Sequence, residues 1–372
     1  MPASAASSYV GVMSGTSMDA VDAVLLRFDA TGRAHAAGGS TVAMPAALRE
    51  DLLALNTPGP DELNRAALAS AELAALYARA VSEVLETTRT PAASVAALGI
   101  HGQTVRHRPD LGYTIQINAP ARVAELTGID VIADFRSRDI AAGGQGAPLV
   151  PAFHAAQFTC AKTRVVLNLG GIANITILGA DGSIRGFDTG PANMLMDAWA
   201  HRHLGRPYDT DGAWGASGRC LAGLLEQMLA DPWFAMPPPK STGRDDFNLA
   251  WLERQLAEAP SRHSLPDAVD VQATLLQLTA QSVAAAIRHY APNAADVLIC
   301  GGGSRNKALV TALQAALPCP VGSTDAHGLP AQWVEAAAFA WLAWCHDSGR
   351  PAGLPEVTGA SRPTILGCKY LA

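Results

Sequence analysis

The chain has 372 residues, of which 49% are hydrophobic and 16% charged, and its formal net charge is −6. This length and apolar content predict two domains with sizeable cores, and the scattered acidic excess excludes the basic surface that a nucleic-acid partner needs. The six cysteines show no CxxC pair or zinc-ligand spacing, and no apolar run is long enough to span a membrane. We therefore expect reduced thiols, a cytosolic location and no membrane partner.

In chain order, the first half alternates short apolar runs with one long Ala- and Leu-rich segment. The pattern predicts two strands around an opening turn, a third strand, a long helix with Asp61 as its N-cap, another strand, a helix and a strand. These elements are expected at residues 9–13, 21–28, 41–44, 61–87, 95–100, 119–127 and 129–133. The next segment, residues 134–154, mixes Gly and polar residues with Ile, Leu, Val and Phe, which favours a functional crossover between domains over a linker.

The second half repeats the opening pattern of the first. Residues 163–190 read as strand, Gly-containing turn and β-rich return, as residues 8–32 do. Further helices are expected near residues 192–204, 216–231, 270–290, 306–317 and 331–345, with a strand at 296–300. The repetition predicts two α/β domains of like topology that face one another, with the ligand in the cleft between them.

Three Gly-containing turns each follow an expected strand, at residues 14–16, 170–171 and 301–303. Gly lets main-chain N–H groups approach an anion, so three such turns favour a nucleotide site, although any single turn can be only a tight connection. No GxxxxGK[ST] loop and no GxGxxG run opening a helix occurs, so hairpin turns would hold the phosphates. Asp19 beside phosphates is sensible if Mg²⁺ lies between them; the alternative for Asp19 and Asp22 is turn capping.

Other polar residues could carry chemistry. Asp188, in GFDTGPANM, ends a strand at a sharp turn and is either a general base or an Asx-turn residue. Arg136 suits a carboxylate ligand or an internal ion-pair network with neighbouring acids. His101 and Gln103 follow a strand and could bind a sugar, although a lone His is more often packed. Glu335 is an acidic residue in an apolar segment, so it lies either at a helix start near the surface or in a functional site.

The chain resembles the anhydro-N-acetylmuramic acid kinase family from about residue 8 to about residue 367. The motifs that carry the resemblance are GVMSGTSMDAVDAVL, HGQTVRH, DFRSRDIAAGGQGAPLVPAFH, LNLGGIANIT, FDTGPANMLMDAW, PKSTGR, DVQATL, CGGGSRN and EAAAFAWLAW. The resemblance implies a fold of two similar domains of the actin-like ATPase (ribonuclease H-like) type around an interdomain cleft. We expect the N-terminal α/β domain at residues 1–133, completed by residues 350–372, and the C-terminal domain with the ATP and catalytic elements at residues 134–349.

The resemblance also implies a reaction and its cofactors. Water opens the 1,6-anhydro bond of 1,6-anhydro-N-acetylmuramic acid while ATP, with Mg²⁺, phosphorylates O6. The product is N-acetylmuramic acid 6-phosphate, an intermediate of peptidoglycan recycling in the bacterial cytoplasm. The family also leads us to expect a homodimer.

By the same resemblance, Asp188 is the catalytic residue that deprotonates the attacking water. Arg136 would meet the lactyl carboxylate of the substrate, and His101, Gln103 and Glu335 would line the sugar pocket. Asp19 would hold the metal indirectly, through water. The expected nucleotide-binding residues are Gly15, Thr16, Ser17, Met18, Asp19, Ala20, Val21, Asp22, Gly170, Gly171, Asn174, Gly301, Gly302 and Gly303.

The sequence departs from the family pattern at Ala20 and Ala192, where Gly is usual. A methyl group at Ala20 is expected to crowd a positive-φ turn, whereas Ala192 stands at an expected helix start, where Ala costs little. Another sugar or acid kinase, in which Asp188 activates a substrate hydroxyl and no water is consumed, is the first alternative. A sugar-sensing regulator or a nucleotide-gated chaperone would need an added DNA-binding or substrate-binding module, and none is visible.

Overall fold

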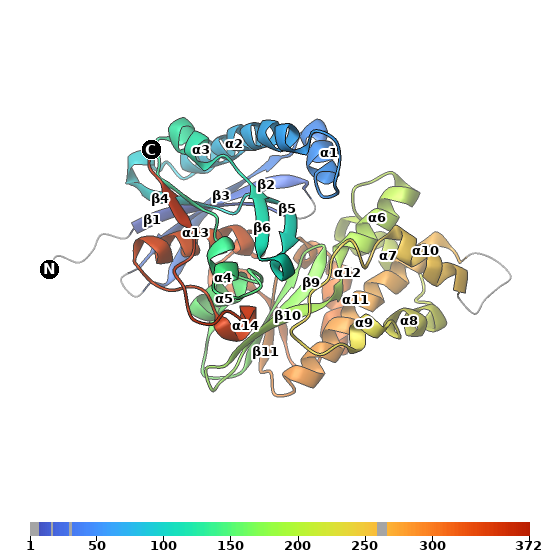
Figure 1. Ribbon diagram of the computed structural model, residues 1–372. Helices are drawn as coiled ribbons and strands as arrows, with labels where there is room; N and C mark the ends of the chain where they lie inside the picture. The colour runs from blue at the N-terminus through green and yellow to red at the C-terminus, as the bar shows by residue number, and fades with distance from the viewer. Residues whose placement is uncertain (1–6, 16–17, 30–31, 259–265) are drawn as a thin grey trace. The chain divides into compact units, whose positions relative to one another are not determined.

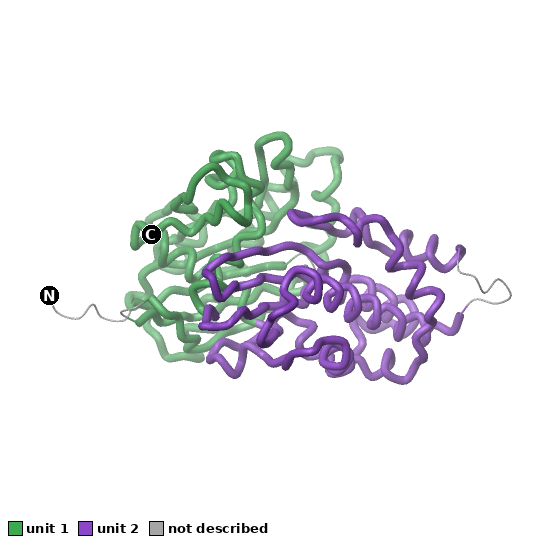
Figure 2. The backbone as a smooth tube through the Cα atoms, turned by 90° about the horizontal axis from the view of Figure 1, so that it is seen from below, with its two compact units in different colours: residues 1–157, 333–372 green, residues 158–332 purple. Residues whose placement is uncertain are grey.

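The computed structural model describes residues 7–15, 18–29, 32–258 and 266–372. The chain divides into two compact units, shown in different colours in Figure 2: unit 1 comprises Met1–Gln157 and Trp333–Ala372, and unit 2 comprises Phe158–Gln332. This division differs from the expected one, because residues 134–157 and 333–349 belong to unit 1. The apolar helix of the latter segment packs on the sheet of unit 1, which the sequence pattern alone did not indicate.

Unit 1 contains a six-stranded sheet with the order β13-β7-β4-β1-β2-β3 (Figure 1). Strand β2 is antiparallel to β1 and β3, whereas β1, β4 and β7 run parallel. A separate hairpin consists of β5 and β6. The strands are β1 (Ser7–Ser14), β2 (Ala20–Phe28), β3 (Ala34–Ala43), β4 (Val95–Ile100), β5 (Gln103–Arg108), β6 (Tyr113–Ile117), β7 (Val131–Ala133) and β13 (Cys368–Tyr370).

Helices pack on the sheet of unit 1, with α2 against β2 and β3, and α13 against β1, β2 and β4. Helix α13 approaches closely because β1 and β4 carry Gly11 and Gly99, where a Cβ would overlap the main chain of Ala336 and of Phe339. The helices of this unit are α1 (Ala46–Ala54), α2 (Glu62–Thr87), α3 (Pro120–Thr127), α4 (Ser137–Ala141), α5 (Val150–Phe158), α13 (Val334–Asp347) and α14 (Pro355–Thr358).

Unit 2 contains a five-stranded sheet with the order β10-β9-β8-β11-β12. Strand β9 is antiparallel to β8 and β10, whereas β8, β11 and β12 run parallel. The order and directions match those of β3-β2-β1-β4-β7 in unit 1, which is the arrangement of a ribonuclease H-like domain. The strands are β8 (Arg164–Leu169), β9 (Ile172–Leu178), β10 (Ile184–Pro191), β11 (Asp296–Cys300) and β12 (Val321–Ser323). Two units of this kind in one chain confirm the expected actin-like fold class.

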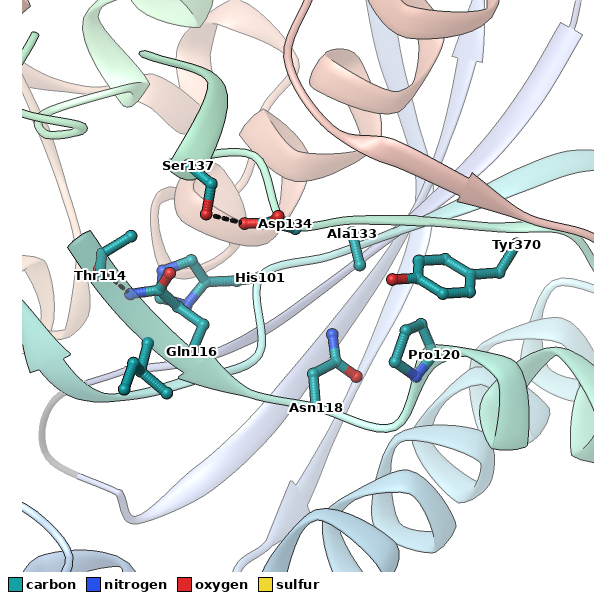
Figure 3. A pocket seen from close by; sticks show the side chains of 10 residues that line it. His101, Thr114, Gln116, Asn118, Pro120, Ala133, Asp134, Ser137 and Tyr370 are labelled. Atoms are coloured by element: carbon teal, nitrogen blue, oxygen red, sulfur yellow. Dashed lines mark hydrogen bonds between the residues drawn. The ribbon is translucent and has the colours of Figure 1, made fainter. Parts of the chain in front are cut away.

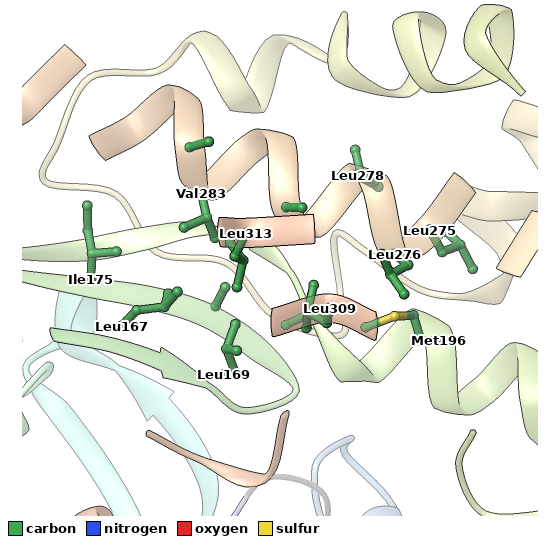
Figure 4. Close-up of a cluster of buried hydrophobic side chains, with 14 of the residues drawn as sticks. Leu167, Leu169, Ile175, Met196, Leu275, Leu276, Leu278, Val283, Leu309 and Leu313 are labelled. Atoms are coloured by element: carbon green, nitrogen blue, oxygen red, sulfur yellow. The ribbon is translucent and has the colours of Figure 1, made fainter. Parts of the chain in front are cut away.

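The core of unit 2 forms between its sheet and helices α11 and α12. Figure 4 shows Leu167 and Ile175 of the sheet near Val283 of α11 and Leu313 of α12, all members of one buried cluster. The helices are α6 (Asn193–Leu204), α7 (Ala213–Ser217), α8 (Ala222–Leu229), α9 (Pro232–Ala235), α10 (Leu249–Glu258), α11 (Ala268–Tyr290) and α12 (Lys307–Ala316). Among the helices of both units in the described ranges, none has the length and apolar character needed to cross a membrane.

Short 3₁₀ turns connect several elements, at Ala92–Ser94, Pro109–Leu111, Thr210–Gly212, Gly302–Arg305, Thr324–His327 and Ala331–Trp333. Two local expectations need correction. The helix expected at residues 216–231 is broken into α7 and α8, because Gly218 and Leu221 between them have extended backbone. Asp61 stands at the N-cap position of α2, but its carboxylate accepts a hydrogen bond from Asn64 instead of capping a main-chain N–H.

Candidate functional site

The expected site residues of unit 1 follow the ends of three parallel strands. Gly15 comes after β1, His101 after β4, and Arg136 shortly after β7. Because β1, β4 and β7 run parallel, their carboxyl ends meet at the same edge of the sheet. Ligands of α/β sheets bind at this edge, so unit 1 gathers these residues where a site is expected.

The opening turn joins β1 to β2. Its Met18 N–H donates to the carbonyl of Gly15 at 3.1 Å, and Met18 has a left-handed φ of 55° with its side chain buried. Thr16 and Ser17, two of the expected nucleotide-binding residues, lie outside the described residues. Ala20 is the first residue of β2, paired with Ala43, so the expected crowding of a positive-φ turn by its methyl group is wrong. The left-handed conformation belongs to Met18 instead.

The two acids of this segment have different surroundings. Asp19 is exposed, and its carboxylate lies 3.4 Å from the Arg49 guanidinium. Asp22 lies within β2 and accepts a hydrogen bond of 2.6 Å from the Thr41 hydroxyl, so it is not a turn cap. Val21 between them is buried in the core of unit 1. Of the residues expected in this segment, Asp19 is therefore the acid whose side chain faces solvent.

Arg136 and His101 form the central polar contact of unit 1. The Nε and Nη2 groups of Arg136 both donate to Nε2 of His101, at 3.1 and 2.8 Å. Because a guanidinium cannot accept, His101 is neutral with its proton on Nδ1. Burial lowers the pKa of His101 well below its usual value, and the charge of Arg136 adds to this effect. The ring of His101 packs on Phe339 of α13, with centroids 4.7 Å apart.

A loop carbonyl holds the other side of Arg136. Its Nη1 group donates to the carbonyl of Gly146 at 2.8 Å. The buried carboxylate of Asp139 accepts from the N–H of Gly146 and from the Thr358 hydroxyl, both at 2.8 Å, and so fixes that loop. Burial lowers the pKa of Arg136 to about 10, while the negative charges of Glu335 and Asp139 oppose this change. The guanidinium is thus held in place, and among the described residues one N–H of each η nitrogen has no acceptor.

A polar cavity of about 270 Å³ lies beside His101 (Figure 3). Its other lining residues are Thr114, Ile115, Gln116, Asn118, Pro120, Ala133, Asp134, Ser137 and Tyr370. Hydroxyl, amide and carboxylate groups predominate, a chemistry that suits a hydroxylated ligand. Of the expected sugar-binding residues, His101 lines this cavity, whereas Gln103 is buried at the start of β5 and Glu335 lies in the first turn of α13.

The expected residues of unit 2 also gather at one edge of their sheet. Gly170 and Gly171 form the turn from β8 to β9, Asp188 lies near the end of β10, and Gly301 follows β11. Strands β8 and β11 run parallel, and β10 runs antiparallel to β9, so all three positions share the edge at which β8 ends. In unit 2, as in unit 1, the expected site residues therefore lie at the sheet edge where the parallel strands end.

Asp188 lies in a row of polar side chains across three strands. It is opposite Asn174 on β9, which is opposite Asn168 on β8. The Oδ2 atom of Asp188 accepts a 2.9 Å hydrogen bond from the main-chain N–H of Thr242, and in the described part of the chain Oδ1 accepts none. Burial raises the pKa of Asp188 to about 6, against the opposing effects of the Thr242 N–H and the Lys240 charge. The carboxylate is therefore partly desolvated, ionised at neutral pH and able to accept a proton.

The β8–β9 turn is held by the start of α6. The carbonyls of Gly170 and Gly171 accept hydrogen bonds from the N–H groups of Asn193 and Ala192, at 3.1 and 2.9 Å. The Asn193 amide also donates to the carbonyl of Gly170 at 2.9 Å. Ala192 occupies the N-cap position of α6, as expected. These contacts fix the turn, so its position does not depend on a ligand.

The three glycines after β11 have different roles. A Cβ at Gly301, whose φ is +82°, would overlap Asn168 and lie 2.8 Å from the carbonyl of Leu169. A Cβ at Gly303 would lie 2.7 Å from the Cβ atom of Leu169. Gly302 is exposed, and a Cβ there would meet nothing within 4 Å. Gly301 and Gly303 thus permit close packing on β8, and Gly302 is the one open to a ligand.

PKSTGR carries the family resemblance but no role that the sequence alone indicates, and of the cavity residues the sequence indicates only His101. The cavity depends on the β5–β6 hairpin, whose signal was available in RPDLGY, a Pro-Asp and Gly turn between alternating residues. The contact between Thr242 and Asp188 joins residues far apart in the chain, and no local sequence signal indicates it.

Comparison with known proteins identifies relatives over nearly the whole chain. The family model described as Anhydro-N-acetylmuramic acid kinase matches residues 7–372. The anhydro-N-acetylmuramic acid kinase of Bordetella petrii is 57% identical over 365 residues, covering 98% of this chain and 96% of that protein. That of Burkholderia orbicola is 53% identical over 369 residues, covering 97% and 96%.

Among solved structures, this chain is similar to component A of the (R)-2-hydroxyglutaryl-CoA dehydratase of Acidaminococcus fermentans. The alignment covers 90% of this chain and 96% of that chain, with 15% sequence identity and a TM-score of 0.49. That likeness bears on neither activity nor substrate. The family model and the close relatives are decisive: this chain belongs to the anhydro-N-acetylmuramic acid kinase family.

Proposed function

We propose that this protein uses ATP and water to convert 1,6-anhydro-N-acetylmuramic acid into N-acetylmuramic acid 6-phosphate, a step of peptidoglycan recycling. The water oxygen bonds to C1 as the bond from C1 to O6 breaks, and O6 takes the γ-phosphoryl group while ADP leaves. Capture by phosphorus removes the difficulty of expelling an alkoxide from carbon. Family membership over residues 7–372 supports this reaction.

Asp188 takes the proton of the attacking water. The observation that carries this role is its geometry: one carboxylate oxygen is held by Thr242, while the other accepts no hydrogen bond from the described residues. Its pKa of about 6 leaves it ionised near neutral pH, yet basic enough to accept a proton in the transition state. An Asx-turn residue would instead bond to its own following main chain.

The nucleotide-binding residues are those of the two sheet edges. Gly15 to Asp22 in unit 1 and Gly170, Gly171 and Asn174 in unit 2 serve the phosphates, and Gly301 to Gly303 serve the adenosine. The exposed Gly302 and the fixed β8–β9 turn support this assignment, because neither needs to rearrange before a ligand arrives. Val21 and Asp22 contribute only through the strand that carries them, since their side chains pack or bond within unit 1.

Mg²⁺ accompanies the nucleotide and would neutralise charge that develops on the phosphates. Asp19 suits an indirect contact, because its carboxylate is exposed and its neighbour Arg49 is 3.4 Å away. No group of three or more His, Cys, Asp or Glu side chains placed to hold a metal occurs in the described ranges. The residues therefore fit an ion carried by the phosphates, with Asp19 bound through water.

The sugar binds to unit 1. Arg136 directs its remaining N–H pair at the lactyl carboxylate, and its contacts with His101 and Gly146 hold it ready. Gln103 and Glu335 complete the polar surroundings of the sugar. The cavity beside His101, lined by hydroxyl and amide groups, supports binding of a hydroxylated ring on this unit.

The working form is a cytoplasmic homodimer, as expected from the family. Another sugar kinase of this fold remains the rival, in which Asp188 activates a substrate hydroxyl. Incubation with ATP, Mg²⁺ and a panel of anhydro and ordinary amino sugars separates the two. Phosphorylation of 1,6-anhydro-N-acetylmuramic acid alone supports the proposal, whereas turnover confined to sugars with a free 6-hydroxyl contradicts it.

A further inference from the structure

The PKSTGR segment runs along the outer edge of the unit 2 sheet, beside Asp188. Strand β10 is the edge strand, so its outward N–H groups need partners from elsewhere in the chain. The N–H of Asp188 donates to the carbonyl of Lys240 at 3.2 Å, and the N–H of Thr242 returns to Oδ2 of Asp188 at 2.9 Å. The segment thus holds both the main chain and the side chain of Asp188.

The ammonium group of Lys240 is anchored at the end of α9. It donates to the carbonyls of Phe234 and Trp233, at 3.0 and 3.4 Å, and lies 4.2 Å from the centroid of the Trp233 ring. The indole N–H of Trp233 in turn donates to the carbonyl of Ser241 at 3.3 Å. Two carbonyls and an aromatic face satisfy the cation, so its charge is fixed in position.

Few charged groups face Asp188. Strand β9 presents the neutral amide of Asn174, which lies opposite Asp188 in the ladder. From the PKSTGR segment come the Thr242 N–H and the Lys240 charge, both of which favour the ionised carboxylate. Asp246 lies one step further away, where it accepts from the Thr242 hydroxyl at 2.8 Å.

We propose that Lys240 is a positioning residue for Asp188: its anchored charge favours the ionised carboxylate, and its carbonyl holds the Asp188 main chain so that the neighbouring Thr242 N–H can hold the carboxylate. This inference rests on the proposed role of Asp188 as the base. Lys240 does not serve as a phosphate ligand, because its ammonium is engaged with α9. Removing the charge makes protonation of Asp188 easier, so activity is lost at a higher pH than in the wild type.

The test is the pH dependence of kcat for the wild type, Lys240→Met, Lys240→Gln and Lys240→Arg. The wild-type rate rises with pH through an acid limb with its midpoint near that of Asp188. The Met and Gln variants move this midpoint upward by about half a pH unit or more, and Arg restores it. KM for ATP changes less than about twofold in all three, because the nucleotide site is untouched. Gln retains a donor for the carbonyls, so it tests the charge even if the Met variant fails to fold.

The matched control is Arg202→Met, which removes a cation of unit 2 that pairs with Glu253. The Arg202→Met variant is expected to keep the acid-limb midpoint of the wild type. An unmoved midpoint in Lys240→Gln, or a rise in its KM for ATP of tenfold or so with the limb unchanged, overturns the positioning role and makes Lys240 a nucleotide contact. A different result would contradict the proposed role of Asp188 itself. If the acid limb of the pH profile persisted in Asp188→Asn, the limb could not come from titration of Asp188.

Discussion

Arg136 gives two of its N–H groups to a single nitrogen of His101, at 3.1 and 2.8 Å. This pairing fixes the plane of the guanidinium and requires a neutral imidazole. The Gly146 carbonyl fixes a third N–H, so the side chain is organised before any substrate arrives. Preorganisation of this kind reduces the entropy lost on binding a carboxylate.

Arg136→Ala is expected to raise KM for 1,6-anhydro-N-acetylmuramic acid by about 10- to 100-fold, because a charge-assisted hydrogen bond to the lactyl carboxylate is lost. Steady-state kinetics on this sugar and on an analogue without the lactyl group measure the effect. The exposed neighbour Arg138, changed to Ala, is the control. An equal penalty on both sugars would show that Arg136 does not meet the carboxylate.

Asp188→Asn is expected to lower kcat by about 10²- to 10⁴-fold, because an amide cannot take a proton from water. Affinity for ATP, measured by calorimetry, should change little, since the amide oxygen can still accept from Thr242. Asp181→Asn is the control: Asp181 accepts from its own neighbour Ser183 in an exposed turn, so its loss should leave kcat intact. Loss of ATP binding in Asp188→Asn would mean that the residue has been misassigned.

The same substitution should stabilise the protein in a pH-dependent manner. Burial raises the pKa of Asp188 from 3.8 to about 6, so the native state holds this proton more tightly than the unfolded state does. Wild-type stability is therefore lost as pH rises between these two values, and Asn, which does not titrate, is spared that loss. The free energy of unfolding of Asp188→Asn, minus that of the wild type, should be roughly 1–3 kcal/mol larger above pH 7 than at pH 4. Urea unfolding at both pH values measures the gain, and a gain that is the same at both would refute the assigned cause.

Gly301 and Gly302 provide a matched pair. Gly301→Ala should destabilise unit 2 by about 1–3 kcal/mol, because the residue has φ +82° and no room for a Cβ. Gly302→Ala should leave thermal unfolding unchanged, since its Cβ meets nothing, while weakening ATP binding severalfold. Unchanged ATP affinity in a folded Gly302→Ala protein would place the nucleotide elsewhere.

Much of the fold could be predicted, because its signals are local. The apolar runs of β1, β2, β8 and β9 and the small residues between them repeat in both halves of the chain, so the duplication is visible without a structure. The boundaries of the units could not be predicted in the same way. The composition of α13 shows that it is buried, but the space for it on the unit 1 sheet comes from Gly11 and Gly99 in distant strands.

The candidate site likewise contains residues that the sequence predicts and residues that it does not. Residues that directly follow strands, such as Gly15, His101 and Asp188, could be selected from position in the sequence. The partners that set their chemistry come from other segments of the chain: Thr242 holds Asp188, and Arg136 donates to His101. Such contacts depend on the tertiary fold, and no local pattern encodes them.

The use of water as the nucleophile is the central claim, and turnover in ¹⁸O-water tests it most directly. Wild-type protein, ATP and 1,6-anhydro-N-acetylmuramic acid are incubated briefly, and the phosphosugar is fragmented by mass spectrometry. Unlabelled product kept in the same water for the same time gives the background of anomeric exchange. We predict ¹⁸O at C1 above that background and none in the phosphoryl group. A phosphosugar with no label at C1 beyond the background would contradict the account.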